Sequence, residues 1–137
     1  MIIDLFIPCF IDQVYPQVGA NMVKIFEKLG VGVDYNPEQT CCGQMAFNSG
    51  FWDDARRMGE KFIHDFSNNR KIVAPSASCV GMVRNYYSEL FNNSSLHNQC
   101  KQIQGNIYEF TDFLVNVLHV EDIGAEFNNV ITYHDAC

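Results

Sequence analysis

The residues of this chain with the greatest capacity for chemistry are six cysteines: Cys9, Cys41, Cys42, Cys79, Cys100 and Cys137. The apolar opening, residues 1–11, carries Asp4 and has no basic residue before it, so it does not resemble a signal peptide. We therefore expect a cytoplasmic protein whose cysteines serve metal binding or thiol chemistry rather than a disulfide framework. The alternative is that these cysteines are simply buried small hydrophobic residues.

The adjacent pair Cys41-Cys42, followed by Gly43, is the most specific local pattern. A disulfide between neighbouring cysteines is strained. A metal centre can use both thiolates if the chain bends sharply, and Gly43 permits such a bend because glycine adopts positive φ. Together with Cys9 and Cys79, the pair would provide four thiolates, enough for an iron–sulfur or a zinc site. A pair of buried thiols in a loop is the alternative.

The surrounding sequence alternates short apolar runs with helical patterns. We predict strands over residues 2–8, 31–35, 71–74 and 129–134. Helices are expected from Pro16 to Gly30, from a cap at Asn48 or Ser49 to residue 66, from a cap at Ser76 or Ser78 to residue 91, and over 108–118, with loops over 36–48 and 92–98. This alternation predicts an α/β fold of three layers, with a mostly parallel β-sheet and crossover helices.

The predicted strands place thiols at one edge of that sheet. Cys9 follows the first strand, the Cys41-Cys42 pair lies in the loop after the second, and Cys79 follows the third where a helix begins. Ligands bind beyond the carboxyl ends of parallel strands, so this edge is the expected site. A thiol at a helix N-terminus also has a lowered pKa, which favours the metal-binding thiolate.

The long spacing of the cysteines resembles a known family. Cys9 is followed after 31 residues by Cys41-Cys42-Gly43 and after a further 35 residues by Cys79. With the segments 44–50, 75–79 and 111–118, this pattern resembles the cysteine-rich CCG domain. That domain occurs in heterodisulfide reductases and in iron–sulfur subunits of glycolate- and lactate-oxidising systems.

The resemblance implies an iron–sulfur electron-transfer subunit of a multi-subunit system that oxidises L-lactate, or a related 2-hydroxy acid such as glycolate, to the 2-oxo acid. It implies that Cys9, Cys41, Cys42 and Cys79 hold a [4Fe–4S] cluster, with Gly43 supporting the turn and with no separate catalytic residue. Companion subunits of a lactate-oxidising complex are the implied partners. Zinc is the alternative metal.

One position departs from the family pattern. The reductase motif closes with a CxxC, but here Met82 occupies the second cysteine position. Four thiolates suffice for an ordinary four-iron cluster but not for the five-cysteine pattern associated with a non-cubane cluster. Met82 is therefore expected to pack in the core. Two alternatives stay open: a thiol–disulfide redox enzyme resembling heterodisulfide reductase, and a zinc-stabilised, non-enzymatic interaction domain.

The end of the chain resembles its beginning. Residues 130–137, like residues 2–9, form an apolar run that ends in a cysteine, and 133–137 resemble the first-cysteine segment of a second CCG unit. We therefore expect residues 1–128 to be a first CCG domain and 129–137 the start of a truncated second unit. Cys137 is then a candidate first ligand of a second site. The missing C-terminal half would be a further partner, and the isolated fragment is expected to be inactive.

Composition excludes several other functions. The net charge of −7 disfavours nucleic acid as a partner, and no apolar run approaches the ~20 residues of a transmembrane segment. A Gly-rich phosphate loop is absent from the sequence, so nucleotide or flavin binding is not indicated. Cys100 matches no family position and is expected to be a structural or surface thiol. The remaining polar candidates are expected to be ordinary exposed or strand-end residues: Asp12, Glu38, His64, His97, His119 and His134.

Overall fold

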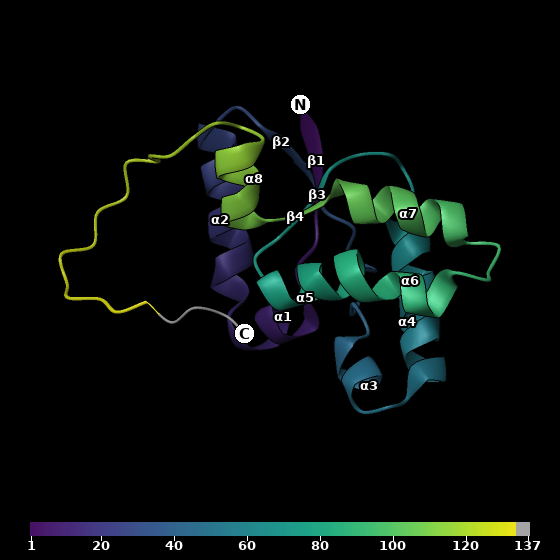
Figure 1. Ribbon diagram of the computed structural model, residues 1–137. Helices are drawn as coiled ribbons and strands as arrows, with labels where there is room; N and C mark the ends of the chain where they lie inside the picture. Colours follow the sequence, from purple (N-terminus) through teal and green to yellow (C-terminus); the bar gives the residue numbers. More distant parts are fainter. Residues whose placement is uncertain (134–137) are drawn as a thin grey trace.

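The computed structural model describes residues 1–133 (Figure 1). Within this range the chain forms a four-stranded sheet in the order β2-β1-β3-β4, and every neighbouring pair of strands is parallel. The strands are β1 (Ile2–Leu5), β2 (Gly32–Asp34), β3 (Ile72–Ala74) and β4 (Ile107–Glu109). In the register, Ile3 pairs with Val33 and Leu5 with Val73. The predicted α/β fold with a parallel sheet is confirmed.

Helices cover both faces of the sheet (Figure 1). On one face lie α2 (Pro16–Lys28) and α8 (Phe110–Asn116), and on the other lie α4 (Trp52–Asp65), α6 (Tyr87–Phe91) and α7 (His97–Asn106). Successive strand side chains point to opposite faces, so Leu5 packs under α2 whereas Phe6 packs against α4. Each face thus has its own buried apolar cluster, which gives the three layers.

The connections that follow β1 and β3 lead toward opposite edges of the sheet. After β1 it passes through α1 (Cys9–Val14) and α2 to β2, and then through α3 (Gln44–Asn48) and α4 to β3 on the other side of β1. The strand order therefore reverses between β1 and β3. In open parallel sheets, the crevice beyond the carboxyl ends of the strands at such a point is where ligands bind.

The predicted third helix is present but is divided into three parts. It runs through α5 (Ala77–Gly81), the π-helical turn η1 (Met82–Tyr86) and α6. The second predicted helix begins later than expected. Residues 44–48 form their own short helix α3, so α4 starts at Trp52 without a side-chain cap at its N-terminus.

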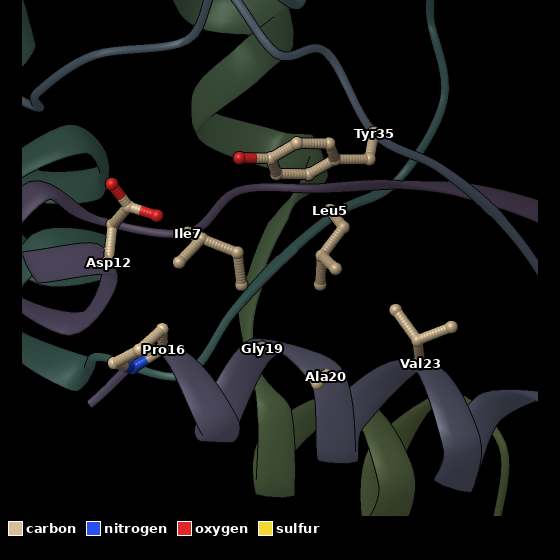
Figure 2. A pocket seen from close by; sticks show the side chains of 8 residues that line it. All are labelled: Leu5, Ile7, Asp12, Pro16, Gly19, Ala20, Val23 and Tyr35. Atoms are coloured by element: carbon tan, nitrogen blue, oxygen red, sulfur yellow. The ribbon is translucent and has the colours of Figure 1, made fainter.

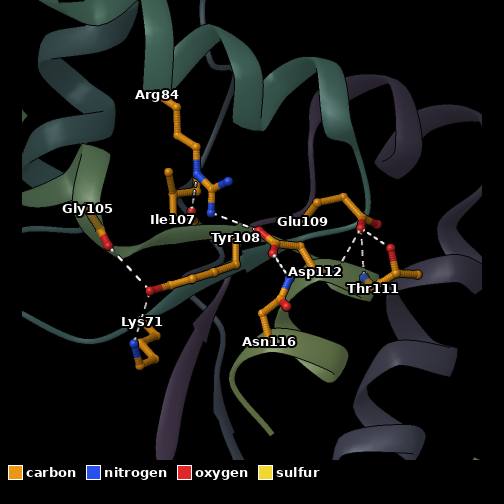
Figure 3. Close-up of polar contacts among 9 residues, drawn as sticks. All are labelled: Lys71, Arg84, Gly105, Ile107, Tyr108, Glu109, Thr111, Asp112 and Asn116. Atoms are coloured by element: carbon orange, nitrogen blue, oxygen red, sulfur yellow. Dashed lines mark hydrogen bonds and ion pairs between the residues drawn. The ribbon is translucent and has the colours of Figure 1, made fainter. Parts of the chain in front are cut away.

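The region after residue 92 differs most from the sequence-based prediction. Helix α7 was not predicted, and residues 107–109 form β4 where a helix start was expected. The Glu109 carboxylate accepts hydrogen bonds from the backbone N–H groups of Thr111 (2.8 Å) and Asp112 (3.2 Å), so it fixes the start of α8 after the strand (Figure 3). The side chain of Arg84 on η1 donates to the Ile107 carbonyl at 2.8 Å and to Asp112 at 2.9 Å, which ties β4 to the helical layer.

The strand predicted over 129–134 is wrong for its described part. Residues 129–133 are irregular and unpaired, and Val130 and Ile131 are exposed. An apolar run forms a strand only when a partner supplies the hydrogen bonds of the ladder, and none lies beside it within residues 1–133. The prediction for His134 and Cys137 lies outside the described residues. No helix among the described residues is long and apolar enough to cross a membrane.

Candidate metal centre

Four cysteine side chains line one cavity at the carboxyl edge of the sheet. Cys9 begins α1 after β1, Cys41 and Cys42 precede α3, and Cys79 lies in α5 after β3. The cavity measures about 230 Å³. Its other lining residues are Pro8, Phe10, Ile11, Gln44, Met45, Ser76 and Ser78. The structure therefore brings together the four thiols that the sequence singled out, from three separate segments.

The thiols differ in exposure. Cys42 is buried, Cys41 and Cys79 are half-buried, and Cys9 is exposed, so the cavity opens to solvent on the Cys9 side. The Sγ atoms of Cys9 and Cys41 lie 3.5 Å apart. All five cysteines within residues 1–133 are free thiols.

The turn after the pair requires glycine for two reasons. Gly43 has φ of 81°, in the left-handed region that other residues avoid. A Cβ at this position would also lie 3.1 Å from the backbone oxygen of Ala55 in α4. The sharp bend expected at Gly43 is therefore present. It places the Gly43 N–H 3.4 Å from the Cys41 Sγ, as a hydrogen-bond donor.

Hydrogen bonding between the thiols divides them into two acidic and two weakly acidic groups. A hydrogen bond from Cys42 lowers the pKa of Cys41 to about 5, and another lowers the pKa of Cys79 to about 7. The pKa of Cys42 is raised because its proton is shared with Cys41 and Cys79. Burial raises the pKa of Cys9. Metal binding would displace the remaining protons, since the thiolate is the ligand.

Two residues that hold the cysteine loop were missed by sequence reasoning. The side-chain amide of Gln39 accepts from the Ile7 N–H at 2.7 Å and donates to the Leu5 carbonyl at 3.0 Å, which ties the loop to the end of β1. The fully buried Tyr87 donates its hydroxyl hydrogen to the Cys42 carbonyl at 2.9 Å. Tyr87 could be assigned only to an apolar helix stripe, because its 45-residue separation from Cys42 gives no local signal.

The other candidates take no part in the thiol cavity. Met82 is buried in the core beside α4 and α6, as expected, and Cys100 is buried in the same cluster. Asp12 and Glu38 are exposed, also as expected. Among residues 1–133, no histidine lines the cavity.

A second hollow lies beside α2 and is not lined by any of the cysteines among residues 1–133 (Figure 2). It measures about 190 Å³ and lies between α2 and Tyr35, with the side chains of Leu5 and Ile7 at its base. Gly19 lets α2 approach closely, because a Cβ there would meet the Ile7 Cδ1 at 3.1 Å. Its lining is mostly apolar, with Asp12 as its one carboxylate, so it offers no set of metal donors.

The side chains that line the thiol cavity are of a type that binds metal. Within the described range, no three His, Cys, Asp or Glu side chains lie close enough together to hold one metal ion. Thiolates are the ligands of all-cysteine zinc sites and of iron–sulfur clusters, so the chemistry of these four side chains fits either kind of metal centre.

Comparison with known proteins identifies the family. The family model for the CCG cysteine-rich domain matches residues 3–84, which is more than half of the chain and includes all four cavity cysteines. The chain belongs to the CCG cysteine-rich domain family.

Curated relatives match over the whole chain. It is 39% identical over 137 residues to lactate utilization protein A of Geobacillus thermodenitrificans and 40% identical over 138 residues to lactate utilization protein A 2 of Bacillus cereus. It is also 39% identical to lactate utilization protein A of Oceanobacillus iheyensis. Each match covers 100% of this chain but only 56–57% of the relative. No solved structure matches the chain significantly.

Proposed function

We propose that this chain is part of an iron–sulfur electron-transfer subunit in a system that oxidises L-lactate, or a related 2-hydroxy acid such as glycolate, to the 2-oxo acid. Cys9, Cys41, Cys42 and Cys79 would hold a [4Fe–4S] cluster, which supplies one-electron transfer when bound. The observation that carries this proposal is the meeting of four thiols from three segments in one cavity. The names of the relatives support lactate as the substrate.

The residues around the cavity would set the properties of the site. The Gly43 N–H donates to the Cys41 sulfur, and hydrogen bonds of this kind to cluster sulfurs tune the reduction potential. Gln39 and Tyr87 hold the loop that carries Cys41 and Cys42. We place the activity in the cytoplasm, because a reducing compartment keeps such thiols free.

The proposed assembly is larger than this chain. The chain spans 57% of the length of the first relatives that it matches. We propose that residues 1–128 form a first CCG unit, that 129–137 begin a second unit, and that Cys137 is the first ligand of its site. The second unit and companion subunits would be the partners, and the first unit alone would not oxidise lactate.

Thiol–disulfide exchange is a second candidate, favoured by the 3.5 Å separation of the Cys9 and Cys41 sulfurs. Here the two thiols would form a disulfide and pass two electrons and two protons to a substrate disulfide, which becomes two thiols. Peptide mapping after incubation with oxidised glutathione tests this candidate. A Cys9–Cys41 disulfide in the cluster-free protein supports it, and unmodified thiols contradict it.

The cluster is tested by anaerobic purification followed by a visible spectrum and assays of iron, sulfide and zinc. A broad absorption band near ~400 nm with iron and sulfide is expected. Zinc without colour would instead support a zinc-stabilised interaction domain. Absence of iron and sulfide after anaerobic reconstitution would refute the cluster.

A matched pair of variants tests the ligand set. Cys42 and Cys100 are both buried thiols, but only Cys42 lines the cavity. Cys42→Ser is expected to abolish the iron-dependent absorption, whereas Cys100→Ser is expected to retain it. The reverse result would show that the ligand set is wrong.

A further inference from the structure

A hollow larger than the two described above lies next to the thiol cavity and is not used by the proposed cluster. It measures about 590 Å³, within the range of small-molecule sites. It lies between α3, α5 and the π-helical turn η1, and we name it the α3–η1 hollow. Its lining residues are Gln44, Phe47, Asn48, Ala77, Ser78, Gly81, Met82, Asn85 and Tyr86.

The lining contains no charged side chain, although the chain carries a net charge of −7. The lining offers no side chain of opposite charge to an ionic ligand, so an uncharged ligand fits it better.

Aromatic rings form one wall of the hollow. Phe47 stacks on Trp52 with ring centroids 5.6 Å apart and an interplanar angle of 11°. Phe47 also contacts Tyr86 on η1 at 5.4 Å, so the wall joins α3 to η1. Aromatic faces of this kind bind flat rings by stacking.

Three carboxamide groups supply the polar part of the lining. They belong to Gln44, which is half-buried, and to Asn48 and Asn85, which are exposed, so all three are accessible to a ligand in the hollow. Each carboxamide both donates and accepts hydrogen bonds. Together they match a ligand whose edge carries N–H and C=O groups side by side.

Hydrogen bonds with α7 and β4 stabilise η1, which forms one side of the hollow. The Gln104 side chain donates to the carbonyls of Val83 (3.1 Å) and Arg84 (2.9 Å), and Arg84 itself is anchored to β4 (Figure 3). These contacts support η1. Such π-helical turns are rare in proteins overall, but those that occur are often found at functional sites. A preformed site loses less free energy in ordering when a ligand binds.

We propose that the α3–η1 hollow binds an uncharged, planar heterocycle whose edge carries C=O and N–H groups. Gln44 and Ser78 line both the hollow and the thiol cavity, so the bound ring would lie beside Cys79. The binding site does not depend on the cluster, and its test is separate from the tests of the cluster.

The test is titration of the purified protein with lumichrome, an uncharged three-ring compound, and with guanosine, which presents similar groups on a nucleobase. Binding is followed by lumichrome anisotropy and by the fluorescence of Trp52, the single tryptophan, which stacks on a lining residue. We expect saturable binding of either probe. The probe that binds more tightly indicates whether the natural ligand carries a three-ring system like that of lumichrome or a nucleobase. Saturation by neither probe would overturn the proposal.

Cavity filling localises the binding. Gly81 lines the hollow, and a Cβ there would meet only the Asn85 Nδ2, at 3.9 Å, so we expect the side chain of Gly81→Leu to fill part of the hollow. We expect it to weaken binding at least tenfold. Gly105→Leu on α7, where nothing lies within 4 Å of the added Cβ, is the matched control and should bind as the wild type does. Wild-type affinity in Gly81→Leu would refute the site.

Two further measurements keep the proposal testable if Gly81→Leu does not fold. Asn85→Ala, at an exposed position, should weaken binding by about threefold to tenfold through the loss of one hydrogen bond. FMN, which adds a phosphate to a related ring, should bind more weakly than lumichrome. Equal affinity for FMN, or no effect of Asn85→Ala, would contradict the assigned ligand class.

Discussion

Replacing Gly43 with alanine separates two reasons for a glycine after the paired cysteines. The first is conformational, because φ of 81° strains any other residue by about 1–2 kcal/mol. The second is steric, because the added Cβ would lie 3.1 Å from the Ala55 oxygen and 3.4 Å from the Met58 Cβ. Gly50 provides the matched control, since its φ is 82° and nothing lies within 4 Å of an added Cβ.

The two variants should therefore differ by the steric contribution alone. Gly50→Ala should lower the free energy of unfolding by about 1–2 kcal/mol. Gly43→Ala should lower it by a further 1–3 kcal/mol or so, because overpacking costs about that much. Urea denaturation of both variants measures the difference, which should also appear as a gap of several degrees in Tm.

The same pair tests the link between the turn and the cluster. Gly43→Ala should reduce the iron bound per chain, because the turn positions Cys41 and Cys42, whereas Gly50→Ala should not. Equal destabilisation by the two variants would show that α4 does not crowd the turn. Equal iron content would show that the bend at Gly43 is not needed for ligand placement.

Three further predictions concern the packing and the charges. Tyr87→Phe should cost about 1–3 kcal/mol in a denaturant titration, because it leaves the buried Cys42 carbonyl without its 2.9 Å donor, and an unchanged midpoint would contradict this role. Gly59→Ala should lower the free energy of unfolding by about 1–3 kcal/mol, because the added Cβ would lie 2.9 Å from the Phe91 ring of α6. Gly105→Ala should raise it by about 0.5–1 kcal/mol, because nothing lies within 4 Å of a Cβ at that position of α7. The same sign for both variants would refute the packing argument. Burial raises the pKa of Asp4 above 3.8, so the native state binds the Asp4 proton more tightly than the unfolded state does. Ionised Asp4 therefore lowers the free energy of unfolding as the pH rises from about 4 through the raised pKa. The stability of Asp4→Asn relative to wild type should increase over this pH range in thermal melts, and a constant difference would exclude the effect.

The fold was largely predictable because its apolar periodicities are local. The strands before Cys9, before the cysteine pair and before Cys79 were predicted within a few residues, as were α2 and most of α4. The elements that were not predicted are α1, α3, α7 and β4. The conformation of α7 and β4 depends on partners distant in the chain. Tyr108 on β4 pairs with Val73 of β3, and this pairing overrides the helical pattern of the residues that follow.

The sequence by itself determined which thiols are available and that they follow the carboxyl ends of the strands, because local patterns set the order of strands and helices along the chain and the spacing of the cysteines. Only the tertiary structure decided how those thiols meet. The Cys9–Cys41 contact, the burial of Cys42 and the hydrogen bonds from Gln39 and Tyr87 join segments that are more than 30 residues apart. The α3–η1 hollow is likewise absent from any local pattern. Such features arise from the packing of whole elements, and no short stretch of sequence encodes the distances between them.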